Sequence, residues 1–254
     1  MGIVPPLVDL CKSKTSIELL RQVAWVLSQL CRFLDPPTPN QIIKKILPQL
    51  SELIKYKDEL ILRDISWAFS YVTNNGSDSI KMVVDIGVVS RMVPLLSCVN
   101  LQTPILRALG NIVADDDNHT QAVLDCNVLD YFPALLNHAD QKIQKEAVWF
   151  LSNILAGTQS QKQTVIDAGL LPIITYKLSN GSFKGQKEAA WAVSNLMRDG
   201  NLKQLEKLVE TGFLRPLCKM LECSDAPLVK VKLRKEEDIH NFFENFPGNA
   251  QWNS

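Results

Sequence analysis

Two segments of the sequence carry the same set of chemically capable side chains at the same spacing. In each segment a glutamate comes three residues before a tryptophan, and an asparagine follows that tryptophan by four residues. The two sets are Glu146, Trp149 and Asn153, and Glu188, Trp191 and Asn195, and we call each set, or its equivalent in another repeat, a rung. On a helix, the members of one set fall within about 60° of one another. Each segment therefore presents a carboxylate, an indole and an amide on one face, which indicates a binding surface.

The opposite face of the same helices is apolar. It consists of Ala147, Leu151 and Ile154 in the first segment and of Ala189, Val193 and Leu196 in the second. An isolated tryptophan is more often a core residue, and this interpretation remains the alternative. Here the helix already has a core face that excludes the tryptophan. A ladder of exposed aromatic side chains predicts a ligand.

The tryptophans also mark an internal repeat. Equivalent positions are occupied by Trp25, Trp67, Arg107, Trp149 and Trp191, with separations of 42, 40, 42 and 42 residues. Prolines recur at a similar period, at Pro6, Pro48, Pro94, Pro133, Pro172 and Pro216. Gly87, Gly169 and Gly212 precede three of these prolines.

A period near 42 residues with helical apolar patterning is typical of α-solenoids. One repeat divides into a short segment at 160–169, a middle segment at 170–179 and a longer segment at 186–197. We expect each proline near the first turn of the middle helix, where its missing N–H costs little. We expect each glycine to form the left-handed cap of the preceding helix. The sequence predicts almost no strand.

Composition and charge limit the possible functions. The 254 residues include 27 Lys and Arg against 27 Asp and Glu, which argues against general binding to nucleic acid or membrane surfaces. The longest apolar runs are too short to span a bilayer, and the start does not resemble a secretory signal. Six scattered cysteines without a C-x-x-C pair suggest reduced thiols in an intracellular protein.

No enzyme site is expected from the sequence. His119, His138 and His240 show no cysteine or carboxylate at a recurring metal-ligand spacing. The chain has no G-x-S-x-G motif, no P-loop and no glycine-rich phosphate cradle. We therefore expect no catalytic residue, no metal and no cofactor.

The repeat segments resemble importin-α, the armadillo-repeat receptor for basic nuclear localisation signals. The resemblance lies in ILPQL (46–50), WAFSYVT (67–73), MVVDIGVV (82–89), RALGNIV (107–113), IQKEAVWFLSNILAG (143–157) and FKGQKEAAWAVSN (183–195). It implies an all-α armadillo-repeat solenoid, a right-handed superhelix of three-helix repeats. About five to six units would cover residues 1–225, beginning inside the fourth family repeat and ending in the ninth. Residues 226–254 would form an irregular or disordered tail.

The resemblance also implies a ligand and a set of contacts. In the family a Lys/Arg-rich peptide lies extended along a concave groove. Indoles flank its aliphatic stems, asparagine amides hold its backbone, and acidic residues neutralise its charges. The residues matching the family's minor site are Arg107, Asn111, Glu146, Trp149, Ser152, Asn153, Glu188, Trp191 and Asn195.

Only the last rung of the family's major site is expected in this chain. It would be Trp25, with Gln29 where the family has asparagine. Trp67 with Tyr71, and Arg107, match the region between the two sites. Arg107 is expected to pair with Asp64, either as part of the groove or as a purely structural salt bridge.

The resemblance implies proteins with basic localisation signals as partners, no nucleic acid, no membrane, and residence in cytoplasm and nucleus. No basic segment precedes the repeats here, so the chain alone is not expected to bridge cargo to importin-β. Two alternatives stay open: a truncated regulatory or decoy receptor, and an armadillo scaffold for another extended partner. The run 115–117 is either a solvated loop or a supplementary acidic patch. The basic run 229–235 is either an exposed tail or a mimic of a localisation signal.

Overall fold

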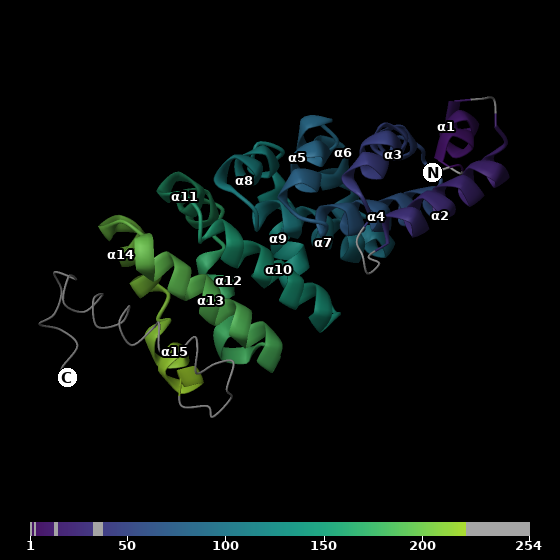
Figure 1. Cartoon of the computed structure of the whole chain (residues 1–254). Helices are drawn as coiled ribbons and strands as arrows, with labels where there is room; N and C mark the ends of the chain where they lie inside the picture. The colour runs from purple at the N-terminus through teal and green to yellow at the C-terminus, as the bar shows by residue number, and fades with distance from the viewer. Residues whose placement is uncertain (1, 3, 13–14, 33–37, 222–254) are drawn as a thin grey trace, which may run out of the picture. The chain divides into compact units, whose positions relative to one another are not determined.

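The computed structural model describes residues 2, 4–12, 15–32 and 38–221, and every regular element within them is helical (Figure 1). The elements in chain order are α1 (Val4–Lys12), α2 (Ile17–Cys31), α3 (Asn40–Leu53), α4 (Glu59–Thr73), α5 (Ser77–Asp85), α6 (Val89–Met92), the 3₁₀ helices η1 (Val93–Ser97) and η2 (Val99–Leu101), α7 (Gln102–Val113), α8 (Asp117–Leu124), the 3₁₀ helix η3 (Val128–Tyr131), α9 (Phe132–Leu136), α10 (Gln141–Ile154), α11 (Gln159–Asp167), α12 (Leu171–Asn180), α13 (Phe183–Asp199), α14 (Leu202–Glu210) and α15 (Leu214–Leu221). The expected tail, 226–254, lies outside the described residues.

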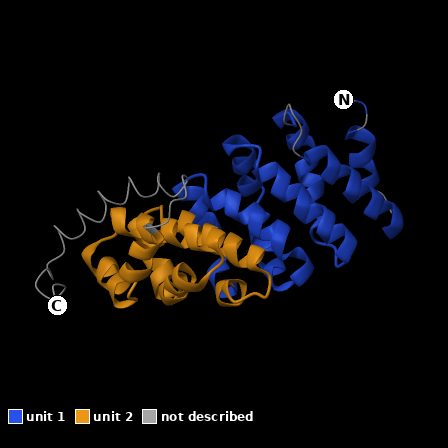
Figure 2. Cartoon of the chain, turned by 90° about the horizontal axis from the view of Figure 1, so that it is seen from below, with its two compact units in different colours: residues 1–131 blue, residues 132–254 orange. Residues whose placement is uncertain are grey.

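The chain divides into two compact units, residues 1–131 and residues 132–254 (Figure 2). In the first unit, α4 packs between α2 and α7, and α5 packs against α3 and α8. In the second unit, α10 packs against α13, α11 against α14, and α12 against α15. Equivalent helices of successive repeats therefore stack on one another within each unit, as in a solenoid.

The repeat formed by α11, α12 and α13 shows how the sequence punctuates its helices. Thr158 caps α11 and forms a reciprocal capping box with Gln161, which satisfies two N–H groups that lack helical partners. Pro172 stands in the first turn of α12, and Ser182 caps α13 through the N–H of Gly185. The three helices predicted from 160–169, 170–179 and 186–197 are confirmed.

The left-handed turns predicted at three glycines are also confirmed. Gly87, Gly169 and Gly212 have φ angles of 73°, 68° and 73°. Asn127, with φ of 55°, occupies the same conformation in the repeat that lacks this glycine. Asparagine tolerates this region better than other residues with a side chain, so the turn survives the substitution.

The proline expectation is wrong at two positions, Pro48 and Pro94. Pro48 lies inside α3, well beyond its first turn, because this helix runs from Asn40 to Leu53. Pro94 is the second residue of the 3₁₀ helix η1 and not part of an α-helix. Because proline has no backbone N–H, the series of main-chain hydrogen bonds in α3 lacks one donor at Pro48.

The core of each unit is aliphatic with a few phenylalanines. In the first unit, Leu27, Phe69 and Leu109 are fully buried on the stacked helices α2, α4 and α7. In the second unit, the rings of Phe132 and Phe150 lie 4.9 Å apart. No helix among the described residues is long and apolar enough to cross a bilayer.

Candidate functional site

The second unit carries two complete rungs on adjacent helices, α10 and α13. The predicted core faces are correct, since Ala147, Leu151 and Ile154 are fully buried, as are their counterparts on α13. Trp149 and Trp191 are partly exposed on the other side. Glu146 is more enclosed than the sequence indicated, with 8% of its surface exposed.

The asparagine of the α13 rung makes a hydrogen bond that joins two repeats. Its side-chain Nδ2 donates to the main-chain oxygen of Ser152 in α10 over 2.9 Å. That oxygen belongs to the last turn of α10, where carbonyl groups lose their helical partners. Its neighbours are satisfied by main-chain N–H groups: Leu155 donates to Leu151, and Ala156 donates to Asn153. Asn195 therefore supplies the donor that the end of α10 lacks.

The first unit repeats this arrangement. Asn111 Nδ2 lies 3.4 Å from the main-chain oxygen of Ser70 and 3.2 Å from Thr73 Oγ1, both near the end of α4. The rung amides were predicted to be available for a ligand backbone. The structure shows that Nδ2 of both amides already donates between repeats, to one acceptor from Asn195 and to two from Asn111, which leaves the amide oxygens and the second hydrogen of Asn195.

Asn153 differs from these two residues. Its Nδ2 is buried and has no hydrogen-bond partner among the described residues. A buried donor without a partner costs free energy, so this amide gains most from any acceptor that reaches it. The hydroxyl of Ser152, expected to be a weaker contact, donates to the Trp149 carbonyl at 2.7 Å and is thus committed to its own helix.

The two glutamates of these rungs influence each other electrostatically. Burial raises the pKa of Glu188 above its ordinary value, and the nearby charge of Glu146 raises it further, whereas Lys145 and Lys187 lower it. A cation placed between the two carboxylates would relieve both the desolvation and the repulsion.

In the first unit, an aromatic pair lies beside a cation. The rings of Trp67 and Tyr71 stack with centroids 5.8 Å apart. With Ser70, Thr103 and the exposed Arg107, they line a pocket of about 380 Å³ between α4 and α7. The pocket lining has no acidic side chain, so it does not offer the charge that a lysine or arginine needs.

Trp25, at 52% exposure, is the most open of the rung tryptophans. It lines a pocket of about 490 Å³ together with Glu18, Arg21, Gln22, Leu60, Arg63 and Asp64. The amide nitrogen of Gln29 lies 3.4 Å from Oγ of the neighbouring Ser28, a contact within α2 rather than between repeats.

The expected ion pair between Arg107 and Asp64 stays a prediction. The carboxylate of Asp64 pairs with Arg63, the residue before it in α4, with Nη2 and Oδ1 3.2 Å apart. This contact with Arg63 was not among the expectations drawn from the sequence. Arg21 pairs in turn with Asp58, the N-cap of α4, at 2.7 Å.

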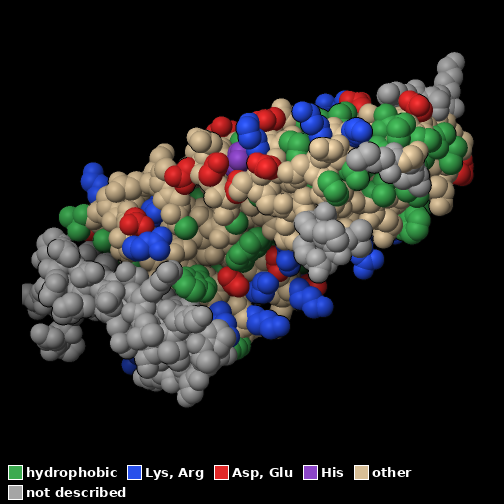
Figure 3. Space-filling model, viewed as in Figure 1, with side chains coloured by type: hydrophobic (Ala, Val, Ile, Leu, Met, Phe, Trp, Pro, Cys, Tyr) green, Lys and Arg blue, Asp and Glu red, His purple; other side chains and the backbone are tan. Residues whose placement is uncertain are grey.

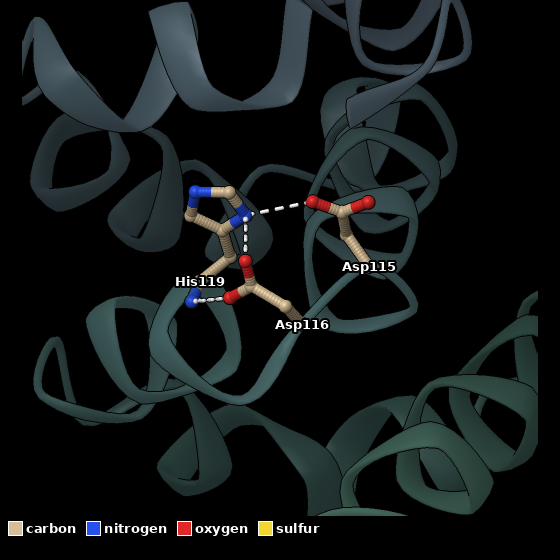
Figure 4. A group of neighbouring side chains, drawn as sticks. All are labelled: Asp115, Asp116 and His119. Atoms are coloured by element: carbon tan, nitrogen blue, oxygen red, sulfur yellow. Dashed lines mark hydrogen bonds and ion pairs between the residues drawn. The ribbon is translucent and has the colours of Figure 1, made fainter. Parts of the chain in front are cut away.

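The acidic run at 115–117 forms a capping cluster (Figure 4). Asp116 accepts from the N–H of His119 at 2.7 Å and caps α8, while Asp115 lies 2.7 Å from the imidazole Nδ1 and accepts a hydrogen bond from Ser77. The sequence-based statement concerned a recurring metal-ligand spacing and did not consider this single cluster, in which Asp115, Asp116 and His119 could together hold an ion. Their own hydrogen bonds account for the arrangement, and the solvated-loop and acidic-patch interpretations both overlooked this capping role.

Acidic and basic side chains are interspersed over the visible surface (Figure 3). This agrees with the zero net charge of the chain.

Comparison with known proteins identifies the class. The Armadillo/beta-catenin-like repeat family matches residues 1–32, 116–156 and 158–198. A designed armadillo repeat protein, solved in complex with the peptide (KR)4, superposes with a TM-score of 0.82 at 25% identity, over 93% of this chain and 99% of that one. An engineered protein superposes with a TM-score of 0.84 at 26% identity, over 96% of this chain and 60% of that one. The chain is an armadillo-repeat solenoid, and such proteins are binding scaffolds rather than enzymes.

Within this class the chain is a homologue of importin-α. It is 45% identical over 241 residues to importin subunit alpha-3 of Arabidopsis thaliana, and 42% identical over 242 residues to importin subunit alpha-1b of Oryza sativa subsp. japonica. Each match covers 94% of this chain and 45% of the relative. The chain therefore spans about half the length of the curated relatives it matches.

Proposed function

We propose that this chain binds extended Lys/Arg-rich segments of other proteins along the rungs of its second unit. The observation that carries the proposal is the repetition of glutamate, tryptophan and asparagine on the packed helices α10 and α13. A cation above an indole contributes about 0.5–2 kcal/mol, and two rungs provide two such positions. The enclosed carboxylates of Glu146 and Glu188 supply the opposite charge.

The relatives support the biological setting. Both plant relatives are named as importin-α subunits, and the designed armadillo protein was solved with a peptide of alternating lysine and arginine. We propose that the ligands are nuclear localisation signals and that the chain acts between cytoplasm and nucleus as an import adaptor. Binding should combine a salt-sensitive attraction to the carboxylates with a short-range contribution from the indoles and amides that salt does not remove.

The experiment measures fluorescence anisotropy of a labelled (KR)4 peptide with wild type, W149A, W191A and the double variant. Each single variant should weaken binding about 2-fold to 30-fold, as expected for the loss of one cation–indole contact. The control is Y176A, because Tyr176 is an exposed aromatic residue on α12 and not on a rung. Equal affinity of the double variant and wild type would refute the proposal.

A scaffold for a different extended partner is the competing function. The first unit favours it locally, since its pocket at Trp67, Tyr71 and Arg107 contains a cation and no carboxylate. An acidic peptide of the same length separates the two functions, because binding of that peptide in preference to (KR)4 would favour the competing scaffold.

A further inference from the structure

A column of basic residues accompanies the tryptophans. Arg21, Arg63, Lys145 and Lys187 each stand four residues before Trp25, Trp67, Trp149 and Trp191, respectively. Residues four apart on a helix are neighbours on one face. The chain therefore places its own cations next to the indoles that would receive the cations of a peptide.

In the second unit, one of these cations already occupies an acidic position. Lys145 Nζ lies 2.6 Å from Glu146 Oε1, and the two side chains are 28% and 10% exposed. The charge of Lys145 also acts on Glu188 in α13 and lowers the pKa of that carboxyl. The charge of Lys145 therefore acts on both carboxylates, Glu146 and Glu188, that a bound peptide would use.

The first unit shows the same arrangement at an equivalent position. Arg63 pairs with Asp64, and again the arginine is the exposed partner while the carboxylate is enclosed, at 49% and 12%. In both units the residue before the rung acid neutralises that acid. This recurrence shows that the Lys145 pair is part of the repeat rather than an isolated surface contact.

We propose that Lys145 is a built-in competitor that a basic peptide must displace from Glu146 before its own lysine or arginine can bind there. This inference rests on the proposed function. An isolated cation of a ligand exchanges one ion pair for another and gains little by doing so. A peptide with several closely spaced cations also fills the indole positions, so Lys145 selects dense basic clusters over single basic residues.

The test compares (KR)4 binding to wild type, K145Q and K203Q. Lys203 is an exposed residue of α14 in the same unit, so K203Q makes the same change in net charge away from the rungs. K145Q should bind about 5-fold to 10-fold more tightly than wild type, comparable to the loss of a partly enclosed charge pair. K203Q should change affinity less than about 2-fold, as expected for a distant, screened charge. K145R keeps the competing cation and should retain wild-type affinity.

A second measurement does not depend on a peptide. Carboxyl titration by NMR should show a higher pKa for Glu188 in K145Q than in wild type, because the cation that lowers it has been removed. The competitor role would be overturned if wild type binds (KR)4 and K145Q binds it with equal or weaker affinity. In that case the proposed function would still stand. If neither protein binds, both proposals fail, because removing a competitor should have uncovered binding.

Discussion

The hydrogen bond from Asn195 to α10 gives a prediction that separates two identical side chains at equivalent positions. Asn195 Nδ2 satisfies the Ser152 carbonyl at 2.9 Å, whereas Asn153 Nδ2 is buried without a partner. N195A should destabilise the protein, because it leaves the enclosed end of α10 with an unsatisfied carbonyl. N153A should cost little or even stabilise, because it removes a buried donor that already lacks an acceptor.

The magnitude follows from the same contacts. Leaving a buried hydrogen-bonding group unsatisfied costs about 1–3 kcal/mol. For a chain of this length, each kcal/mol lowers the unfolding midpoint by about 2–4 °C. N195D should cost at least as much as N195A, since a carboxylate has the same shape as the amide but repels the carbonyl it faces.

The assay is thermal unfolding followed by circular dichroism, with hydrogen exchange to localise the effect. Each repeat of a solenoid contacts mainly its neighbours, so N195A should increase exchange in the last turn of α10 and in the facing turns of α13. Equal destabilisation by N195A and N153A would refute the assignment of this bond as an inter-repeat cap. So would an unchanged midpoint in N195A.

Three further predictions concern a turn, a carboxylate and the thiols. G169A should cost about 1–2 kcal/mol in a urea titration, because φ is 68° and no neighbour lies within 4 Å of an added Cβ, which leaves backbone strain as the cause. The pKa of the Glu188 carboxyl is raised in the folded state, so the folded chain binds a proton there more readily than the unfolded chain. The ionised carboxylate therefore lowers the free energy of unfolding, and this effect should diminish as pH falls through the folded-state pKa. E188Q should raise the thermal unfolding midpoint at neutral pH but not at acidic pH. Iodoacetamide followed by mass spectrometry should modify the exposed Cys98 well before Cys31, whose burial raises its pKa to about 12, and modification of Cys31 at the rate of Cys98 would contradict this.

The fold could be predicted from the sequence because its signals are local and repeated. The anchor spacing, the glycine turns and the apolar face of each inner helix all reflect short-range rules. The turn at Asn127 could also have been predicted, since it stands where its repeat lacks the glycine. Pro48 shows the limit, because the position of a proline does not reveal how far the helix extends before it.

The chemistry of the rungs was harder to predict. The contact between Arg63 and Asp64 was not expected from the sequence, because it depends on side-chain geometry. The role of Lys145 could have been suspected from its spacing to Trp149, but the 2.6 Å contact with Glu146 cannot be read from spacing. The use of rung asparagines between repeats depends on which carbonyl at a helix end lacks a donor, which is a property of the packed structure.

The inter-repeat bond of Asn195 has a consequence for how such a chain can change its length during evolution. The donor is one side chain, but the acceptor is a main-chain oxygen, which any residue at position 152 would provide. A duplicated repeat would therefore contain its own asparagine, and the main chain of the preceding repeat would provide the acceptor. Residues around the acceptor can be substituted without loss of this hydrogen bond. Duplication of a repeat can therefore add further tryptophans and asparagines without a compensating mutation in the preceding repeat.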